Sequence, residues 1–488
     1  MRILVLFLLA ALAIADNITV TVGANECPEC REIATNYVSL SMEVHDGLIY
    51  LGNVTAPNAA FRNLMQTLQS ESGQRGPSIR IGGNSADQSV YYEGTGPLPP
   101  NQTYAITRND LLALRALNAW NGFAVVDTNF FFQNSTVWIS NHVGNITAVV
   151  GWDRIEGVEV GNEVEIYHDS GYRPKTWTFD NYEAEFEAHV AAAEGAGMPH
   201  GRIQGAVFCC HDPPYDDGFA NYTLKYARRG DLASVSHHHY AVGGCEGSTV
   251  TLPELLNSTA GTIAYLQTFA AGASAAGVPF RVGEGNSVSC GGRAGVSDVF
   301  GTALWSVETL LALAAVSGGV NQFNFHGGPQ KNSHYSPIAF PDWPKSTVPA
   351  VRPLFYGMWL VTAATANASV VWSSAVQSSN AAITAHVLRD KNGVMRVVVV
   401  HKDLAATASA ANVVVVFPGA PDRDATLMRL LADGNNATAT NGVTWNGQTF
   451  DGSADGLPVG DKTPETVAQD NGSFAFSMPP RSVALLVI

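Results

Sequence analysis

Basic side chains are scarce in this sequence. Lys and Arg together number 27 against 42 Asp and Glu among 488 residues, which gives a formal net charge of −15 at pH 7. Proteins that bind nucleic acids present clustered Lys and Arg to the phosphates. The shortage of positive charge therefore argues against a nucleic-acid partner and against tight binding of a heavily sulfated polyanion.

Long hydrophobic runs are also missing beyond the N-terminus. The almost purely aliphatic segment from Ile3 to Leu12 is too short to span a bilayer. It follows a basic start at Arg2 and precedes Ala13-Ile14-Ala15, a pattern typical of a signal-peptidase site. We expect residues 1–15 to be a signal peptide rather than a buried helix. The mature protein would then begin near Asp16 and be secreted, with no membrane span.

Acceptor tripeptides for N-glycosylation suit the same compartment. The pattern Asn-x-Ser/Thr occurs at Asn17, Asn53, Asn101, Asn134, Asn145, Asn221, Asn257, Asn367, Asn436 and Asn471. One such tripeptide often arises by chance, whereas this number behind a leader favours a glycosylated secreted protein if the host is eukaryotic.

Cysteines are few and lack the spacing of a zinc site. They are Cys27, Cys30, Cys209, Cys210, Cys245 and Cys290, and six cysteines allow fifteen connectivities between which the sequence does not choose. Cys27-Pro-Glu-Cys30 favours a local disulfide over a redox motif, because no thioredoxin-like βαβ pattern surrounds it. A second CxxC is absent, and the histidines at 237–239 lie on an expected strand. We therefore expect no metal and no cofactor.

From residue 37 to residue 345, short apolar segments alternate with longer helical patterns, which is typical of βαβ units. The expected strands are 37–43, 78–83, 123–127, 158–161, 204–209, 234–240, 280–283 and 320–325. The expected helices include 110–120, 182–193 and 298–315, the last of them amphipathic. Eight such units predict a closed (β/α)8 TIM barrel over 37–345. An open doubly wound sheet is less favoured, because no glycine-rich dinucleotide turn follows the first strand.

The sequence changes character near Val351. Short strands separated by turn pairs such as Asp-Gly and Asn-Gly are expected at 381–388, 395–401, 411–417, 426–431 and 482–488. This pattern predicts a C-terminal all-β sandwich over 351–488 with a structural role. An alternating strand at 18–22, within the N-terminal segment 16–36, is expected to join the sandwich and tie the two domains together.

Two glutamates lie directly behind expected barrel strands, where the active sites of (β/α)8 barrels are found. Glu163 follows Val160-Gly-Asn, and Glu284 follows Val282-Gly283. Retaining glycoside hydrolysis uses one carboxylic acid to protonate the leaving oxygen and a carboxylate about 5–5.5 Å away to attack the anomeric carbon. We interpret the glutamates as this pair, with Asn162 placed to bind the sugar 2-OH. A separation of about 9 Å would indicate inversion instead.

Three longer motifs accompany these glutamates. They are Arg80-Ile-Gly-Gly-Asn-Ser-Ala-Asp87, Val158-Glu-Val-Gly-Asn-Glu163 and Gly283-Glu-Gly-Asn-Ser-Val-Ser-Cys-Gly-Gly292. In combination they resemble glycoside hydrolase family 79, which contains the β-glucuronidases and the heparanases. The C-terminal segment 478–488 is also similar to the closing strand of that family's β-sandwich. The resemblance covers nearly all of the expected mature chain.

The resemblance implies roles for the matching residues. Glu163 would be the acid/base and Glu284 the nucleophile that forms a covalent glycosyl-enzyme. Tyr240 would orient Glu284 by a hydrogen bond, and Arg80 would keep it ionised by charge proximity. Sugar contacts are implied for Glu43, Asn84, Asn162, Tyr240, Gly291, Gly292 and Tyr335, with backbone N–H groups of the two glycines and the Tyr335 hydroxyl facing a uronate carboxylate. Glu43 is alternatively a structural carboxylate at a strand end.

The implied activity is that of an exo-β-glucuronidase, acting on a glycan or glycoconjugate with a terminal β-linked uronic acid, 4-O-methyl-glucuronate included. Family members often place a tyrosine five residues after the nucleophile, where this chain has Ser289. This departure leaves another retaining β-glycosidase specificity open. An endo-acting, heparanase-like enzyme is disfavoured by the acidic charge balance. A non-catalytic sugar-binding wall protein is disfavoured because both glutamates, Asn162 and Tyr240 are present.

Overall fold

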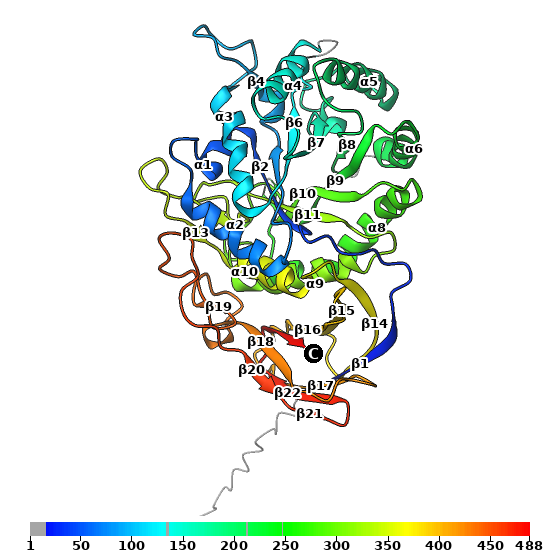
Figure 1. Cartoon of the computed structure of the whole chain (residues 1–488), viewed down its shortest axis with the longest axis vertical. Coiled ribbons are helices and arrows are strands. Elements are labelled where there is room, and N and C mark those ends of the chain that lie inside the picture. The colour runs from blue at the N-terminus through cyan, green and yellow to red at the C-terminus, as the bar shows by residue number, and fades with distance from the viewer. Residues whose placement is uncertain (1–15, 133–135, 211–212, 246) are drawn as a thin grey trace, which may run out of the picture.

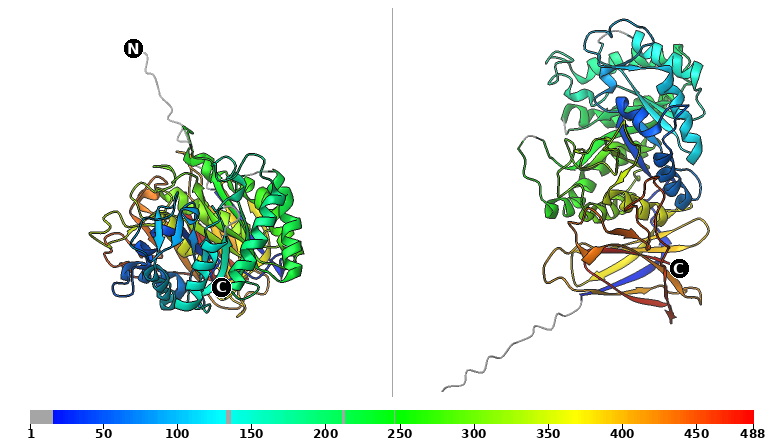
Figure 2. Two further views of the ribbon diagram at one scale, coloured as in Figure 1. Left: turned by 90° about the horizontal axis from the view of Figure 1, so that it is seen from above. Right: turned by 90° about the vertical axis from the view of Figure 1, so that its left-hand side faces the viewer.

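The computed structural model describes residues 16–132, 136–210, 213–245 and 247–488. The expected signal peptide and the acceptor Asn134 lie outside these described residues. The described chain forms a (β/α)8 barrel stacked on a β domain, as the right-hand view of Figure 2 shows. The predicted fold class, a TIM barrel with a C-terminal β-sandwich, is confirmed.

Parallel strands close the barrel in the order β10-β11-β2-β3-β6-β7-β8-β9. Their bounds are β2 (Val38–Glu43), β3 (Ile79–Gly82), β6 (Ala124–Thr128), β7 (Ile155–Val160), β8 (Ile203–Phe208), β9 (Leu232–Val242), β10 (Phe280–Val288) and β11 (Gln322–His326). Each corresponds to a strand predicted from the sequence. Every residue of β6, β7, β8 and β11 is buried, which explains why parallel barrel strands read as near-continuous apolar runs.

Helices surround the barrel (Figure 1). They are α1 (Gly47–Leu51), α2 (Ala59–Ser72), α3 (Arg108–Ala113), α4 (Val137–Val149), α5 (Phe179–Gly195), α6 (Pro213–Arg229), α7 (Leu252–Leu256), α8 (Thr259–Ala275), α9 (Phe300–Ala314) and α10 (Pro353–Ala364). The helix predicted at 110–120 is divided between α3, which starts at a capping box of Thr107 and Asp110, and a 3-10 segment over Leu114–Trp120. Short ribbons pair β4 (Ser89–Tyr91) with β5 (Tyr104–Ile106), and β12 (Ile338–Ala339) with β13 (Ala350–Val351).

Helices α9 and α10 lie between the barrel and the β domain (Figure 1). Every residue of α9 except Ala312 is buried, so the prediction of an amphipathic helix was wrong. The helix packs against α10, against α7 and α8 of the barrel, and against β15 and β16 of the β domain, and this leaves it no water-facing side. Its buried carboxylate, Glu308, is compensated by the β domain, because Lys402 Nζ lies 2.5 Å from Glu308 Oε2.

The β domain is one hydrogen-bonded sheet folded into two layers, a continuous path of strands from which only β20 departs within the described residues, pairing with β18. Its strands are β1 (Asp16–Glu26), β14 (Val370–Ser378), β15 (Ile383–Arg389), β16 (Met395–His401), β17 (Ala411–Val416), β18 (Ala425–Ala432), β19 (Val443–Trp445), β20 (Glu465–Val467), β21 (Gln469–Asp470), β22 (Ser473–Met478) and β23 (Ser482–Val487). A buried core that includes Val20, Val399, Val413 and Leu486 lies between the layers. Strand β14 was not predicted, because most of its residues are exposed and it carries no buried-exposed alternation.

The N-terminal segment joins the β domain, as predicted. Strand β1 pairs antiparallel with β14 and parallel with β17. The predicted local disulfide Cys27–Cys30 follows it, and the other pairs among the described residues are Cys209–Cys210 and Cys245–Cys290. In the described ranges, no helix is both long enough and apolar enough for a membrane span.

The Glu308–Lys402 pair provides a test of how the two domains dock. Both side chains are largely buried, with exposures of 8% and 11%. Replacing Lys402 by Met leaves an unpaired buried carboxylate, and we expect this to cost about 3 kcal/mol of stability. Urea unfolding should show the loss as a lower midpoint. The double variant Glu308→Leu/Lys402→Met removes both charges and should recover much of it, whereas equal midpoints for wild type and Lys402→Met would contradict the assignment.

Candidate active site

The carboxyl ends of the barrel strands surround a cavity of about 690 Å³. Its wall is formed by Glu43, Asn84, Glu163, Ile166, Cys209, Cys210, His238, His239, Tyr240, Gly243, Cys245, Tyr265, Glu284, Ser289, Cys290, His326 and Tyr335. Both predicted catalytic glutamates therefore face one space, which has the size of a typical small-molecule site.

Irregular backbone aims each glutamate at this cavity. Glu163 lies three residues beyond β7 in a left-handed conformation, with φ 51°, and its N–H donates to the carbonyl of Val207 at 3.0 Å. Strand β10 continues through Glu284 rather than ending before it, and its register against both neighbours shifts between Val282 and Gly285. Such a bulge re-aims a side chain without ending the strand.

The two carboxylates lie close together. One oxygen of Glu163 and one oxygen of Glu284 are within 4.8 Å of each other. This matches the close spacing of retaining glycosidases, because inverting enzymes leave room for a water between their carboxyl groups. The geometry therefore favours retention.

Arg80 connects the nucleophile candidate to the floor of the barrel. Its Nη1 donates to Glu284 Oε2 at 2.6 Å and its Nε to Glu159 Oε2 at 2.7 Å. Its Nη2 donates to Asn162 Oδ1 at 2.8 Å and to Asp127 Oδ2 at 3.3 Å. The guanidinium is fully buried, so three carboxylates and one amide take the place of its hydration shell.

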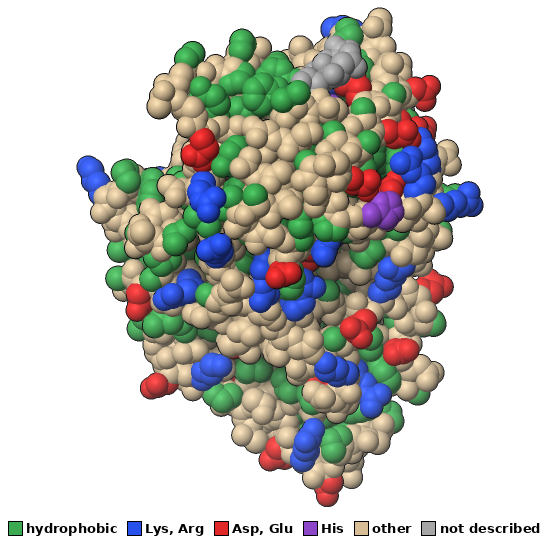
Figure 3. Space-filling view, turned by 45° about the horizontal axis from the view of Figure 1, so that its top comes forward, with side chains coloured by type: hydrophobic (Ala, Val, Ile, Leu, Met, Phe, Trp, Pro, Cys, Tyr) green, Lys and Arg blue, Asp and Glu red, His purple; other side chains and the backbone are tan. Residues whose placement is uncertain are grey.

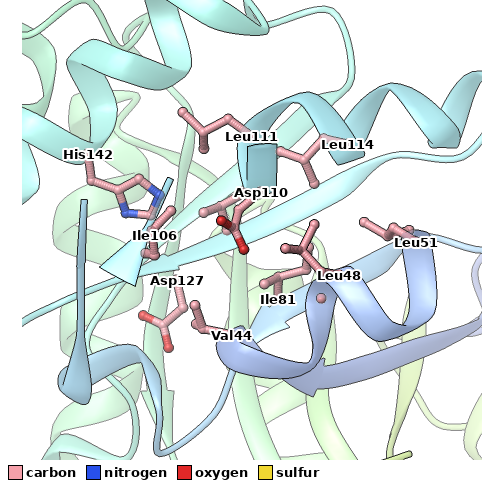
Figure 4. A pocket seen from close by; sticks show the side chains of 12 residues that line it. Val44, Leu48, Leu51, Ile81, Ile106, Asp110, Leu111, Leu114, Asp127 and His142 are labelled. Atoms are coloured by element: carbon pink, nitrogen blue, oxygen red, sulfur yellow. The ribbon is translucent and has the colours of Figure 1, made fainter. Parts of the chain in front are cut away.

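Apolar packing lies next to this floor. Figure 4 shows a small cavity in which Asp127 lies among side chains such as Val44, Ile81 and Ile106. Burial, followed by the charge of Glu159, raises the pKa of Asp127 well above its usual range. The contact with Arg80 acts in the opposite direction on this carboxyl.

The pKa values of the two catalytic candidates are shifted in opposite directions. Burial, and then the charge of Glu284, raises the pKa of Glu163 to about 8. Burial acts in the same direction on Glu284, but the facing positive charges, those of His326 and Arg80 included, outweigh it and lower its pKa to about 2. The pair titrates as a coupled unit. Glu163 is therefore the proton carrier and Glu284 the anion.

A histidine supports the proton carrier. His238 Nδ1 lies 2.9 Å from Glu163 Oε1, and burial lowers the pKa of this ring to about 3. At neutral pH the contact is therefore a hydrogen bond with a neutral imidazole, which fixes the orientation of the acid. Within the 237–239 run, His238 and His239 line the cavity, whereas His237 lies 3.3 Å from Asp216.

Most of the predicted binding residues lie on or just behind the cavity wall. Tyr240 Oη donates to Glu284 Oε1 at 2.8 Å, and the Tyr335 ring stacks at 6.0 Å from the Tyr240 ring. Glu43 reaches the cavity while one of its oxygens accepts from the Ser85 backbone at 2.8 Å and from the Ser85 hydroxyl.

Two asparagines link the catalytic motifs to each other. Asn162 Nδ2 donates to Asn84 Oδ1 at 3.2 Å, and Asn162 Oδ1 accepts from Arg80. Asn84 is on the cavity wall. Asn162 is buried behind that wall, with its backbone N–H directed at Asp87 at 3.4 Å. Its amide is therefore held in one orientation before any ligand binds.

The expected backbone cradle at Gly291 and Gly292 is not formed. The Gly292 N–H donates to the Ser289 carbonyl, and the Gly291 carbonyl accepts from the Tyr335 N–H, both at 3.3 Å. Both glycines have positive φ and fold the loop back on β10, so neither lines the cavity. At this place the wall consists instead of Ser289, Cys290 and Tyr335.

Three residues of the site were not singled out from the sequence. His326, the last residue of β11, lies 3.5 Å from Glu284 and 3.8 Å from Glu43. The strand-end rule that found the glutamates applies to it equally. Glu159 and Asp127 could also have been predicted as site residues, because each is a carboxylate inside an otherwise apolar strand. A charge buried in a strand needs a partner.

Comparisons with known proteins agree with this geometry. The glycosyl hydrolase family 79 C-terminal beta domain matches residues 385–485. A beta-glucuronidase of Aspergillus niger is 25% identical over 505 residues, covering 92% of this chain and 90% of its own. A beta-glucuronidase of Neurospora crassa is 21% identical over 532 residues, covering 93% and 91%. These matches support the resemblance to glycoside hydrolase family 79.

Solved structures share the fold of this chain. A 4-O-α-L-rhamnosyl-β-D-glucuronidase from Fusarium oxysporum superposes with a TM-score of 0.78 at 19% identity, covering 96% of this chain and 100% of its own. A family 51 arabinofuranosidase from Xanthomonas axonopodis pv. citri gives a TM-score of 0.65 at 14% identity, covering 97% and 99%. The protein is thus a glycoside hydrolase on a (β/α)8 barrel.

Glu163, His238 and Glu284 also meet the distance requirement for a metal site, since their donor atoms lie within 4.8 Å of one another. The Arg80 guanidinium, 2.6 Å from Glu284, already supplies the positive charge that an ion would bring. An acid–nucleophile pair therefore accounts for the arrangement without a metal.

The opposite pKa shifts predict the pH dependence of hydrolysis. For an aryl β-glycoside, kcat/KM should stay high through neutral pH and fall as the pH rises past about 8, because Glu163 then loses the proton that it must donate. Loss at the acid end should appear only toward pH 2, where Glu284 becomes protonated. A pH–rate profile measures both limbs. An alkaline limb near the ordinary carboxyl range would contradict the assignment of Glu163.

Proposed function

We propose that the protein is a secreted retaining exo-β-glucuronidase, which removes terminal β-linked glucuronic acid or its 4-O-methyl derivative from a glycan or glycoconjugate. The observation that carries the proposal is the Glu163–Glu284 pair, whose oxygens lie within 4.8 Å of each other while their pKa values shift in opposite directions. The names of the two curated relatives support the choice of glucuronic acid.

The first half of the reaction transfers the sugar to the protein. Ionised Glu284 attacks the anomeric carbon while Glu163 gives its proton to the glycosidic oxygen, so the leaving group departs as a neutral alcohol. In the resting site, Tyr240 and Arg80 each bind a different oxygen of Glu284. Both contacts hold the nucleophile in one orientation and keep it charged until it reacts.

The second half releases the sugar. Part of the raised pKa of Glu163 comes from the charge of Glu284. This charge is lost while Glu284 is esterified, so the pKa of Glu163 falls and its carboxylate becomes a base. It takes a proton from a water that attacks the anomeric carbon, which frees Glu284 and gives the β-anomer.

The cavity wall disfavours a sulfated substrate. Among the described residues that form the wall there is neither Lys nor Arg. The hydroxyls of Tyr335 and Ser289 remain as donors to a single carboxylate. A sulfated chain needs a basic cleft, and the face drawn in Figure 3 carries acidic and basic side chains intermixed. These features disfavour the heparanase-like alternative.

Secretion fits the positions of the acceptor asparagines. The side chains of Asn53, Asn101, Asn221, Asn257, Asn436 and Asn471 belong to exposed residues. Asn145 and Asn367 are exceptions, because both are half-buried. The Nδ2 of Asn145 donates to the Asn141 carbonyl at 2.8 Å, and that of Asn367 donates to Asp390 Oδ2 at 3.3 Å.

Hydrolysis of a panel of aryl β-glycosides tests the activity. We expect wild type to prefer the glucuronide, Glu284→Gln to lose activity to background, and Glu163→Gln to lose about 10²- to 10⁴-fold in kcat/KM because the general acid is gone. Proton NMR of the first product should show the β-anomer. Glu26→Gln, at an exposed position at the end of β1, is the matched control and should behave as wild type.

The panel separates substrate from mechanism. Activity on a neutral glycoside with none on the glucuronide would overturn the substrate assignment alone. Full activity of Glu284→Gln, or an α-anomer as first product, would overturn the retaining mechanism.

Expression in a eukaryotic host tests secretion. We expect the protein in the culture medium with an N-terminus near Asp16, and a loss of mass on treatment with an enzyme that removes N-linked glycans. N-terminal sequencing and intact mass give both answers. Retention inside the cells with Met1 in place would contradict export.

A further inference from the structure

A disulfide between adjacent cysteines lies beside the proton carrier. Cys209 is the first residue after β8, and it is bonded to Cys210. Both cysteines line the cavity, and their sulfur atoms lie within 4.8 Å of a carboxylate oxygen of Glu163. The acid must touch the glycosidic oxygen during the reaction. A group this close to its carboxylate therefore lies beside the bond that breaks.

Backbone contacts fix the disulfide relative to the acid. The Cys209 N–H donates to the buried carboxyl of Glu165, two residues beyond the acid. Two residues before Cys209, within β8, the Val207 carbonyl accepts a hydrogen bond from the Glu163 N–H at 3.0 Å. Val207 has a φ of 56°, which is a strained conformation for a β-branched residue, and the β8–β9 register shifts there. The loop after β7 and the end of β8 are thus held together at two points.

The catalytic glutamates divide the rim of the cavity into two arcs. From Glu284 on β10 through β11, β2 and β3, the wall carries His326, Glu43 and Asn84, which we call the polar arc. Between Glu163 and Glu284 on the other side, the wall carries the Cys209–Cys210 disulfide after β8, then His238, His239 and Tyr240 on β9, and a second disulfide, Cys245–Cys290. The part of this wall next to Glu163, with Ile166 from the loop after β7 and Tyr265 from α8, we call the sulfur arc: Ile166, Cys209, Cys210 and Tyr265.

The arcs have different binding chemistry. A sugar ring presents hydroxyls that need donors and acceptors, and the polar arc supplies carboxylate, amide and imidazole groups. The disulfide is polarizable and offers no hydrogen-bond donor, so it favours an apolar or aromatic surface. Aromatic rings make favourable contacts with sulfur, and the Tyr265 ring adds a second flat apolar surface.

We propose that the Cys209–Cys210 disulfide is a wall of the leaving-group site and selects β-glycosides with a flat aromatic aglycone. The proposal rests on the proposed function, because it takes the sugar to lie along the polar arc and the leaving group along the sulfur arc. Cys209 is almost fully buried while Cys210 is exposed, so the disulfide presents one edge to the cavity mouth, where an aglycone would enter.

The test compares two glucuronides that differ in their leaving group. One carries a naphthyl group and the other a methyl group, and kcat/KM is measured because it reports the step in which the leaving group departs. For Cys209→Ala/Cys210→Ala we expect the naphthyl-to-methyl ratio of kcat/KM to fall about two- to tenfold relative to wild type, the range of a lost sulfur–aromatic contact.

Control variants distinguish the loss of the Cys209–Cys210 contact from general damage to the protein. Cys27→Ala/Cys30→Ala removes the disulfide behind β1, outside the cavity, and should leave the ratio at the wild-type value. The inhibition constant of free glucuronic acid reports whether the sugar site is intact, and Cys209→Ser/Cys210→Ser provides a second pair of side chains at the same place.

The outcomes are distinct. A wild type that hydrolyses neither glucuronide overturns the proposed function, and the same pair of leaving groups is then placed on whichever sugar the panel identifies. If the glucuronides are hydrolysed but both Cys209/Cys210 variants keep the wild-type ratio with an unchanged inhibition constant, the leaving-group wall is overturned. A fall in the ratio with an unchanged inhibition constant supports it.

Discussion

The site depends on one buried guanidinium. Arg80 is fully enclosed in the barrel and contacts Glu284, Glu159, Asp127 and Asn162. Such a cation is tolerable in a dry interior only with carboxylates around it, and those carboxylates need the cation in return. The nucleophile is therefore one member of a charge cluster buried inside the barrel. Its ionised state and its position follow from the same contacts.

Departures from regular strand geometry place the remaining groups. A bulge in β10 turns Glu284 toward the cavity, and the irregular end of β8 gives Glu163 a backbone partner. Left-handed residues such as Glu163 and Val207 are costly in isolation. Here they are stabilised by the packed strands on either side, so the rigidity of the barrel is what keeps the two carboxylates at a reactive separation.

Sequence patterns predicted the barrel and the two glutamates, but they did not predict the whole site. The barrel strands were predictable because full burial makes them apolar, and the glutamates because they interrupt that apolarity at strand ends. Strand β14 was missed because it lies mostly exposed. The polarity of α9 was misjudged because the partner of Glu308 is Lys402, distant in sequence and supplied by the other domain.

The errors at the site have a related cause. The Gly291–Gly292 turn has the glycine content of a ligand-binding loop, yet the Gly292 N–H is used by Ser289 within the turn itself. A high glycine content indicates that a backbone segment can adopt unusual conformations. It does not indicate which groups the N–H donors of that segment face. His326 and Glu159 were recoverable by the rules that found the glutamates, since each is a polar residue in or at the end of a buried strand.

The surroundings of Glu163 show why an acid and a nucleophile of the same residue type can work side by side. The Arg80 guanidinium donates to Glu284, whereas Glu163 lies next to a neutral imidazole and a disulfide, neither of which carries a positive charge. A low-polarity neighbourhood raises the pKa of an acid. The same apolar wall therefore serves proton donation and aglycone contact at once. This explains why a polar arc and a sulfur arc meet at this residue.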